Sequence, residues 1–193
     1  MAEPETIAHP ELSAASPRWR PGDERPDVDA MLRVDQAGEY GATRIYAGQL
    51  AVLGEGQSAS RLIARMASQE QRHLKHFDQL LVERGVRPTL LQPLWQVAGH
   101  GLGAFTALIG PNAAMACTAA VEDEIDRHYA QQLTALGDRE PELAATITEF
   151  QADEREHRDT AVAAGAEDSF GYPLLYSAIR AGCRLAIELS KRI

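Results

Sequence analysis

The sequence predicts an all-α fold, a four-helix bundle that carries two further helices. Apolar residues recur at alternating steps of three and four through four long segments, which is the spacing of one helix face. Glycines and prolines bound these segments, and two helix pairs repeat one pattern of glutamate and histidine. The 193 residues, 45% of them hydrophobic, suffice for one domain with its own core, or at most two small ones.

The N-terminal segment differs in composition from the rest of the chain. It contains scattered charges and five prolines, Pro4, Pro10, Pro17, Pro21 and Pro26. Such a segment buries too little apolar surface to order itself, so we expect a flexible proline-rich tail over residues 1–26 and a folded domain over 27–193. The start lacks the basic flank and apolar run of a secretion signal, which predicts a cytoplasmic compartment.

Charge and cysteine content narrow the class of protein. The net charge of −9 argues against nucleic acid as the main partner, because proteins that grip phosphates normally carry a basic excess. The two cysteines, Cys117 and Cys183, have apolar neighbours and no metal-type spacing. We therefore expect small buried thiols and no disulfide framework.

The first predicted helix pair covers residues 27–85. Its first helix runs from Asp27 to glycines at 54 and 56, and its second follows a cap at Ser58 and ends at Gly85. The second helix has the clearest apolar face in the chain, formed by Ile63, Met66, Glu70, His73, Phe77 and Leu80. A glutamate and a histidine thus lie on a buried face, where an isolated carboxylate costs several kcal/mol unless it is paired or binds a metal.

Residues 88–121 contain no formally charged side chain. Prolines and glycines interrupt the apolar run, whereas a transmembrane helix needs roughly 20 consecutive apolar residues. We therefore favour a short uncharged helix between Leu90 and Ile109 that lies in a membrane interface or against a hydrophobic partner. An internal core helix and a full membrane span are the alternatives.

A second helix pair and a final helix complete the predicted bundle. The third bundle helix lies between Pro111 and Gly137, and the fourth lies between Asp138 and Gly165. In the last helix, over residues 172–193, arginine and lysine are spaced among apolar residues. This helix either packs on the bundle or binds an anionic surface.

The two helix pairs share one arrangement of metal-ligand residues. Each has a glutamate on its first helix and, 31 or 32 residues later, a Glu-x-x-His sequence on its second. Ferritin-like bundles use this set to bind two metal ions between facing helices. The pattern identifies six candidate ligands, Glu39, Glu70, His73, Glu122, Glu154 and His157. The alternative is a metal-free bundle in which these residues are solvated charges or paired buried groups.

The mixed ligand set also narrows the metal and its chemistry. Carboxylate and imidazole favour iron or manganese over copper(I), and no thiolate is placed to favour zinc. Two ferrous ions side by side activate dioxygen, so we expect oxidation or hydroxylation, but these residues leave an oxygenase, an oxidase, a peroxidase and an iron store open. His76 and His128 are expected as surface or supporting residues, and Tyr129 either supports a ligand or belongs to the core.

Several short strings outside the ligand set resemble one enzyme family. The strings are RVDQAGEYGA at 33–42, RIYAGQ at 44–49, RPT at 87–89, PLW at 93–95, ACT at 116–118, AVE at 120–122 and AGCR at 181–184. They closely resemble the demethoxyubiquinone hydroxylase family of ubiquinone biosynthesis, and the similarity extends from about residue 27 to the C-terminus.

The resemblance implies a carboxylate-bridged di-iron monooxygenase with two iron ions per chain. Such an enzyme uses O2 to hydroxylate the ring of a polyprenyl methoxy-methyl-benzoquinol, demethoxyubiquinol. The six candidate ligands fall on the family's iron ligands, and Glu70 and Glu154 are expected to bridge.

The resemblance also implies a peripheral membrane protein at the cytoplasmic face of the cell membrane, or at the equivalent inner-membrane face in an organelle. The segment from Leu90 to Ile109 would enter the membrane face, so that a membrane-dissolved quinone reaches the irons. The sequence has no glycine-rich dinucleotide loop and no iron–sulfur cysteine set. Electrons are therefore expected from a partner of unknown identity or by direct reduction, and other ubiquinone-biosynthesis proteins are candidate partners.

Overall fold

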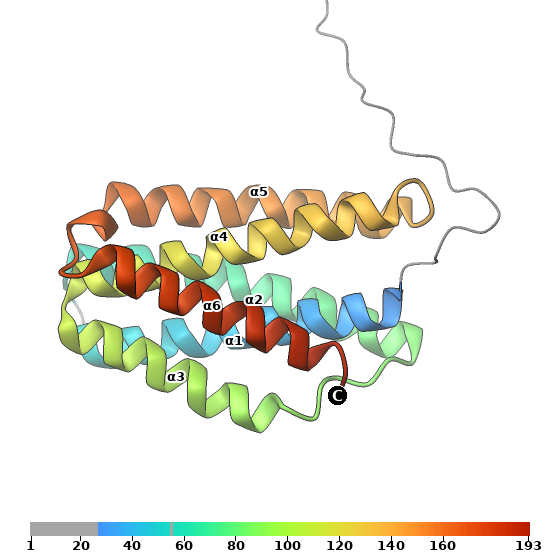
Figure 1. Ribbon diagram of the computed structural model, residues 1–193, viewed down its shortest axis with the longest axis horizontal. Coiled ribbons are helices and arrows are strands. Elements are labelled where there is room, and N and C mark those ends of the chain that lie inside the picture. Colours follow the sequence, from blue (N-terminus) through green and yellow to red (C-terminus); the bar gives the residue numbers. More distant parts are fainter. Residues whose placement is uncertain (1–26, 55) are drawn as a thin grey trace, which may run out of the picture.

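The computed structural model describes residues 27–54 and 56–193, and the regular structure in this part of the chain is helical, with no strand (Figure 1). The elements are α1 (Val28–Leu53), α2 (Ser58–Arg84), α3 (Gln92–Ile109), α4 (Pro111–Leu136), α5 (Pro141–Ala163), the short 3-10 helix η1 (Ala166–Asp168) and α6 (Tyr172–Ser190). The predicted all-α class is confirmed. The predicted tail over residues 1–26 lies outside the described residues.

Local signals in the sequence set the helix boundaries. The Asp27 carboxylate accepts a hydrogen bond from the Ala30 amide at 2.9 Å and caps α1. Helices α3 to α6 each have a proline in the first two positions, where the missing amide hydrogen costs nothing. Gly85 ends α2 in the left-handed conformation, as predicted. The predicted cap at Ser58 is wrong, because Ser58 is already helical and Gln57 takes the cap position without a side-chain hydrogen bond.

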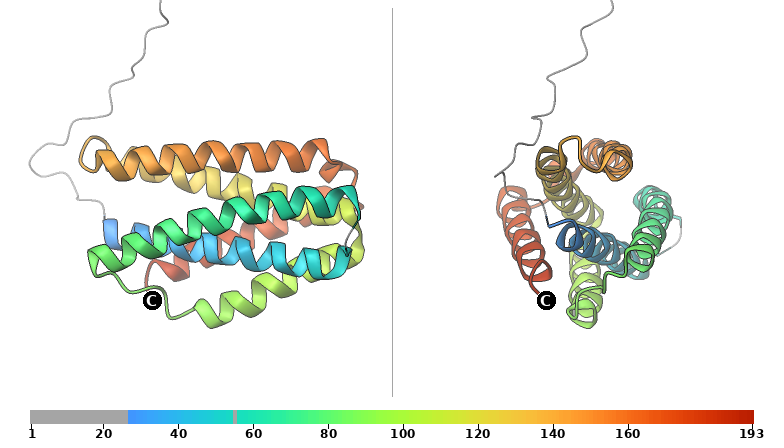
Figure 2. Two further views of the ribbon diagram at one scale, coloured as in Figure 1. Left: turned by 180° about the vertical axis from the view of Figure 1, so that it is seen from behind. Right: turned by 90° about the vertical axis from the view of Figure 1, so that its right-hand side faces the viewer.

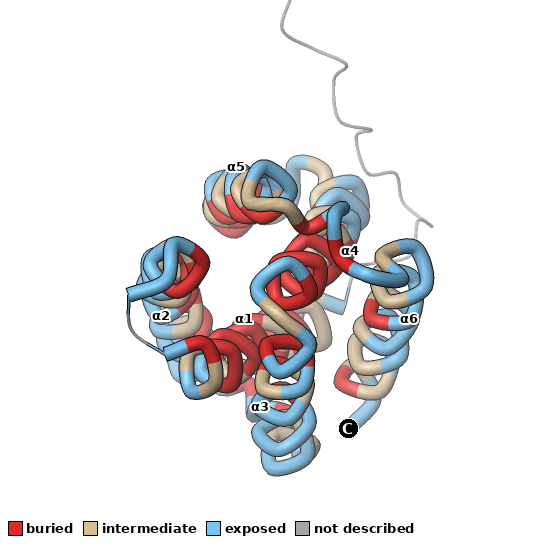
Figure 3. The backbone as a smooth tube through the Cα atoms, turned by 90° about the vertical axis from the view of Figure 1, so that its left-hand side faces the viewer, coloured by how far each residue is buried: buried red, intermediate tan, exposed pale blue. Residues whose placement is uncertain are grey.

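Helices α1, α2, α4 and α5 form the four-helix bundle (Figure 2). Helix α1 packs against α2, and α4 packs against α5, so each predicted pair is also a pair in space. The buried faces of the four helices turn toward a common interior, as the end view in Figure 3 shows. Helix α3 connects the two pairs along the outside of α1, and α6 lies against α4 and α1.

The bundle interior has an apolar cluster toward each end. One cluster includes Met66 and Met115, and the other includes Leu32, Phe77 and Ile147. On each bundle helix, the candidate ligands lie between the residues of these two clusters along the chain. The apolar core therefore encloses a polar layer at mid-height.

Helix α3 packs on α1 through glycines rather than through large side chains. A Cβ atom at Gly103 would overlap the backbone of Ile45, and a Cβ atom at Gly48 would overlap the backbone of His100. Glycine permits this close approach of two backbones. Two of the glycines that interrupt the uncharged segment, Gly99 and Gly103, therefore belong to its contact surface with α1.

The opposite face of α3 is open. It exposes large apolar side chains, Leu94, Val97, Phe105, Leu108 and Ile109. The helix thus combines two of the alternatives that the sequence left open, the internal helix and the helix with an apolar contact outside the fold. One of its faces packs on the bundle, and the other is free for an apolar contact. Among residues 27–54 and 56–193, no helix is both long and apolar enough to cross a membrane.

Helix α6 is attached to α4 through a buried acid. The carboxylate of Glu124 is fully buried and accepts hydrogen bonds from Arg180 at 3.1 Å and Arg184 at 3.0 Å. The arginines therefore pack the last helix on the bundle, one of the two roles predicted for them. Both cysteines are free, as predicted, but only Cys117 is buried, because Cys183 on α6 is partly exposed.

Candidate metal centre

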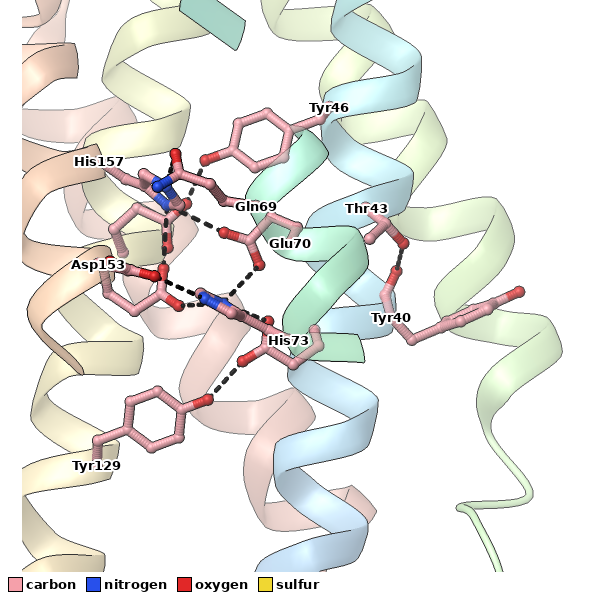
Figure 4. Close-up of polar contacts among 12 residues, drawn as sticks. Tyr40, Thr43, Tyr46, Gln69, Glu70, His73, Tyr129, Asp153 and His157 are labelled. Atoms are coloured by element: carbon pink, nitrogen blue, oxygen red, sulfur yellow. Dashed lines mark hydrogen bonds and ion pairs between the residues drawn. The ribbon is translucent and has the colours of Figure 1, made fainter. Parts of the chain in front are cut away.

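The six candidate ligands meet in the middle of the bundle. They are Glu39 from α1, Glu70 and His73 from α2, Glu122 from α4, and Glu154 and His157 from α5. Each residue is at most 1% exposed, so none of them is a solvated surface charge. Figure 4 shows that the labelled members of this set point toward one another. A spacing of three residues places each glutamate and its histidine on the same helix face.

The ligand atoms form two overlapping groups. We define metal position 1 by Glu39, Glu70, His73 and Glu154, and metal position 2 by Glu70, Glu122, Glu154 and His157. Within each group, one ligand atom per residue lies within 4.8 Å of the others. Glu70 and Glu154 belong to both groups, so these two carboxylates are placed to bridge two metal ions.

Two tyrosines link the helix pairs crosswise. The Tyr46 hydroxyl donates a hydrogen bond to Glu122, and the Tyr129 hydroxyl donates one to Glu39. Each tyrosine lies seven positions after the glutamate of its own helix and binds the glutamate of the other pair. Burial raises the pKa of both hydroxyls well above the usual range, so they stay protonated donors. Tyr129 therefore combines its two predicted roles, because it contacts a candidate ligand and also belongs to one of the apolar clusters.

Each histidine turns one ring nitrogen inward and the other outward. Nδ1 of His73 lies 3.1 Å from the nearest carboxylate oxygen, and its Nε2 lies 3.0 Å from Oδ2 of Asp153. Nδ1 of His157 lies 3.0 Å from the nearest carboxylate oxygen, and its Nε2 lies 3.1 Å from Oε1 of Gln69. An outer acceptor on Nε2 fixes the ring orientation and the tautomer, which leaves Nδ1 free to bind a metal.

Without a cation, this cluster of acids is electrostatically unfavourable. Burial raises the pKa of Glu70, Glu122 and Glu154, and the neighbouring carboxylates raise the pKa of each further. Burial also acts to raise the pKa of Glu39, but contacts with His73 bring it below the usual value. Burial acts to lower the pKa of His73, but contacts with Glu154 and Glu39 raise it to about 10.

The same residues present polar atoms that no hydrogen bond satisfies. Both oxygens of Glu70 and of Glu154, and Nδ1 of His73 and of His157, are buried and make no hydrogen bond within residues 27–54 and 56–193. Buried polar groups normally have partners. A cluster of unsatisfied carboxylate oxygens and imidazole nitrogens fits hard or borderline divalent cations such as iron and manganese.

We expect the metal-free protein to lose stability as pH rises from 6.5 to 10. The pKa of His73 rises from 6.5 to about 10 on folding, so the folded chain binds more protons than the unfolded chain in this range. The raised pKa values of Glu70, Glu122 and Glu154 act in the same direction. Stability therefore falls with rising pH. The pKa of His157 is lowered, mainly by burial, so its effect is confined to lower pH.

Thermal unfolding at a series of pH values, with and without ferrous iron, measures this effect. Iron should reduce or reverse the slope, because metal binding requires deprotonated ligands and strengthens as pH rises. Parallel curves for the metal-free and iron-loaded protein would contradict the prediction.

Sequence reasoning selected the residues of both groups but missed their supports. His76 and His128 belong to neither group, in agreement with the prediction that they are not ligands. His128 is buried and contacts Gln132 at 3.0 Å, so it is not a surface residue. The outer acceptors Asp153 and Gln69 were missed because their contacts with histidine join α5 to α2. Tyr46 was given no role in the site, although its offset from the preceding glutamate equals that of Tyr129 and would have identified it.

A helical bundle with two overlapping groups of buried carboxylates and imidazoles is compatible with the class of di-metal proteins. Comparison with known protein families identifies the family to which the chain belongs. Residues 26–190 match the family described as ubiquinone biosynthesis protein COQ7. The chain belongs to this family, and the resemblance seen in its short strings is confirmed.

Three similar proteins have closely related names. The 3-demethoxyubiquinol 3-hydroxylase of Rhodospirillum rubrum is 53% identical over 175 residues, which cover 90% of this chain and 82% of the relative. The mitochondrial NADPH-dependent 3-demethoxyubiquinone 3-hydroxylase of Homo sapiens is 50% identical over 173 residues, with 88% and 79% covered. The mitochondrial 5-demethoxyubiquinone hydroxylase of Saccharomyces cerevisiae is 41% identical over 182 residues, with 86% and 78% covered.

Proposed function

We propose that this protein is a di-iron monooxygenase of ubiquinone biosynthesis that uses O2 to hydroxylate the ring of a polyprenyl methoxy-methyl-benzoquinol, demethoxyubiquinol. The family and the names of its relatives support this reaction. The single observation that carries the proposal is the pair of overlapping ligand groups at metal positions 1 and 2. The proposed cofactor is two iron ions per chain, held by the six residues of these groups in a ferritin-like domain over residues 27–193.

In this proposal the residues of the site have separate tasks. When bound, the two irons supply the electrons and the Lewis acidity that oxygen activation requires. Glu70 and Glu154 hold the two metal positions next to each other, because both carboxylates belong to both groups. Tyr46 and Tyr129 restrain the remaining two glutamates by hydrogen bonds. Burial of the whole cluster keeps bulk water from the reacting centre.

An apolar cavity beside the bundle fits a lipid substrate. It has a volume of about 550 Å³, lies between α1, α3, α4 and α6, and is lined mainly by alkyl side chains and glycines, among them Ile45, Leu102 and Val121. This volume is within the usual range for small-molecule pockets. Val121 precedes the candidate ligand Glu122, so one wall of the cavity belongs to a helix turn that carries the site. We infer that the polyprenyl tail of the quinol lies in this cavity.

Turnover by protein loaded anaerobically with ferrous iron tests the proposal. With demethoxyubiquinol, a reductant and ¹⁸O2, the expected product is a quinol that has gained one labelled oxygen. NADPH is the first reductant to use, because the human relative is named as NADPH-dependent. A quinol oxidase would form water without a hydroxylated product, and an iron store would hold far more than about two irons per chain. Either result would overturn the proposed function.

We also propose that the exposed apolar face of α3 attaches the protein peripherally to a membrane, at the cytoplasmic face of the cell membrane or the equivalent inner-membrane face in an organelle. Val97 and Leu108 on this face are 71% and 73% exposed. Burial of such a side chain contributes about 1.5–3 kcal/mol. Replacing both residues with aspartate should therefore weaken binding to phospholipid vesicles by at least about 100-fold.

Vesicle sedimentation measures this binding, and Val82→Asp is the matched control. Val82 is 82% exposed but belongs to α2 rather than α3. This control should bind vesicles like the unmodified protein. If the double variant of α3 also binds unchanged, the membrane-facing role of α3 is excluded. Leu102 is a poorer choice for this test, because it lines the cavity.

A further inference from the structure

The two metal positions are built from matching residues of the internal repeat. Residues of α1 match residues of α4 found 83 positions later, and residues of α2 match residues of α5 found 84 positions later. In this register the matched pairs are Glu39 with Glu122, Tyr46 with Tyr129, Gln49 with Gln132, Glu70 with Glu154, and His73 with His157. Any matched pair that differs in charge therefore distinguishes metal position 1 from metal position 2.

The outer partners of the two histidines differ in this way. Asp153 Oδ2 lies 3.0 Å from Nε2 of His73, at metal position 1. The matching residue, Gln69, has its Oε1 3.1 Å from Nε2 of His157, at metal position 2. The two contacts are nearly equal in length, but one acceptor is a carboxylate and the other is a neutral amide. A carboxylate forms the stronger hydrogen bond and makes the imidazole a better metal ligand.

A second matched pair differs in the same direction. Asp35 lies one helix turn before Glu39 and accepts a hydrogen bond from Gln132 at 2.7 Å. The residue matching Asp35 is Thr118, and the residue matching Gln132 is Gln49, which donates to the threonine hydroxyl at 3.4 Å. Metal position 1 thus has an acidic residue beside its glutamate where metal position 2 has a hydroxyl. The Asp35 carboxylate also lies 3.4 Å from Nε2 of His128, and the residue matching His128 is Ile45. Position 1 therefore gains an acid together with an imidazole at this pair, and the difference that favours a cation at position 1 is Asp153.

We propose that the two metal positions are unequal, and that position 1 binds its metal first and more tightly because Asp153 supports His73. This inference rests on the two-metal site of the proposed function. Loss of an outer partner of a ligating histidine typically costs 10–100-fold in metal affinity. The Gln69 amide at position 2 keeps part of this effect. We therefore expect the metal affinities of the two positions to differ by about tenfold. Loading is then ordered, and position 2 is the exchangeable one.

Stepwise titration of the metal-free protein with ferrous iron, under anaerobic conditions and against a competing chelator, tests this inference. The unmodified protein should bind iron in two steps about tenfold apart in affinity. Asp153→Asn should weaken the tighter step by about tenfold and merge the two steps. Gln69→Glu should instead strengthen the weaker step. The control is Glu156→Gln, which removes one charge from an exposed position of α5 and should change neither step.

Mössbauer spectroscopy with one equivalent of ⁵⁷Fe reports how the metal distributes. A tenfold difference in affinity divides one equivalent between the two positions in a ratio of about 3:1, so two ferrous signals of about that ratio are expected for the unmodified protein, and two of about equal intensity are expected for Asp153→Asn. Two equal steps in the unmodified protein, or equal responses to Asp153→Asn and Glu156→Gln, would overturn the inference and leave the proposed function standing. If Asp153→Asn does not fold, an unchanged weaker step in Gln69→Glu overturns it. Failure of the unmodified protein to bind iron would overturn both.

Discussion

Replacing Glu154 with glutamine is expected to abolish the two-iron centre and to lower quinol hydroxylation by at least about 100-fold. Glu154 belongs to both metal positions, so its loss affects both ions at once. Glutamine keeps the volume of the side chain but has no negative charge and only one acceptor oxygen. Loss of a residue that only hydrogen-bonds to a ligating histidine costs up to about 100-fold in metal affinity or activity. Loss of a ligand that belongs to both metal positions should therefore cost more. Iron content per chain and the hydroxylation rate measure the effect.

Glu122→Gln is the matched comparison for this variant. Glu122 belongs to metal position 2 only, so its replacement should leave about one iron per chain, whereas Glu154→Gln should leave less. The metal-free Glu154→Gln protein should unfold at a temperature no lower than the metal-free unmodified protein. The substitution removes a buried carboxyl whose pKa is raised by burial, so it removes an unfavourable charge. Retention of about two irons by Glu154→Gln would contradict the assignment.

Gly103→Ala is expected to destabilise the protein by about 1–3 kcal/mol. The added Cβ atom would overlap the backbone of Ile45 in α1, and two packed helix backbones cannot relieve the overlap by a side-chain rotation. Helix α3 must then move away from α1. Because Leu102 of α3 lines the apolar cavity, the substitution should also weaken binding of a long-tailed quinol.

Gly101→Ala in the same helix is the control for Gly103→Ala. A Cβ atom at Gly101 would have no neighbour within 4 Å, so alanine should stabilise the helix by about 0.5–1 kcal/mol. Thermal unfolding measures both variants, since 1 kcal/mol corresponds to about 2–4 °C for a chain of this size. Equal melting temperatures for the two variants would show that the glycine contact between α1 and α3 is not required.

Much of the fold and the membership of the candidate site follow from local patterns. A helix face is defined by residues three or four apart, so the apolar periodicity reveals where Glu70 and His73 lie without any knowledge of packing. Capping residues and prolines act within a few positions, which is why the predicted ends of α1 and α4 agree with the structure. The predicted cap at Ser58 is wrong by one position, because the helical backbone already includes Ser58 and Gln57 precedes it.

The role of the uncharged segment depended on tertiary contacts. The sequence showed that glycines interrupt it, and this argued against a membrane span. Only the packed structure shows that Gly103 meets Ile45 and Gly48 meets His100, so that one face of α3 belongs to the fold while the other is exposed. A glycine has no side chain whose periodicity could indicate which neighbour it contacts.

The sequence by itself determined four amphipathic helices and the six acidic and imidazole residues on their buried faces, because both are properties of spacing along a single helix. The tertiary structure decided how these residues combine. It shows that Glu70 and Glu154 belong to both metal positions, and that Asp153 lies beside His73, 80 residues away along the chain. Such contacts depend on the rotation of α2 and α5 about their axes and on the offset between the two helices along the bundle. The periodicity within one helix specifies neither the rotation nor the offset.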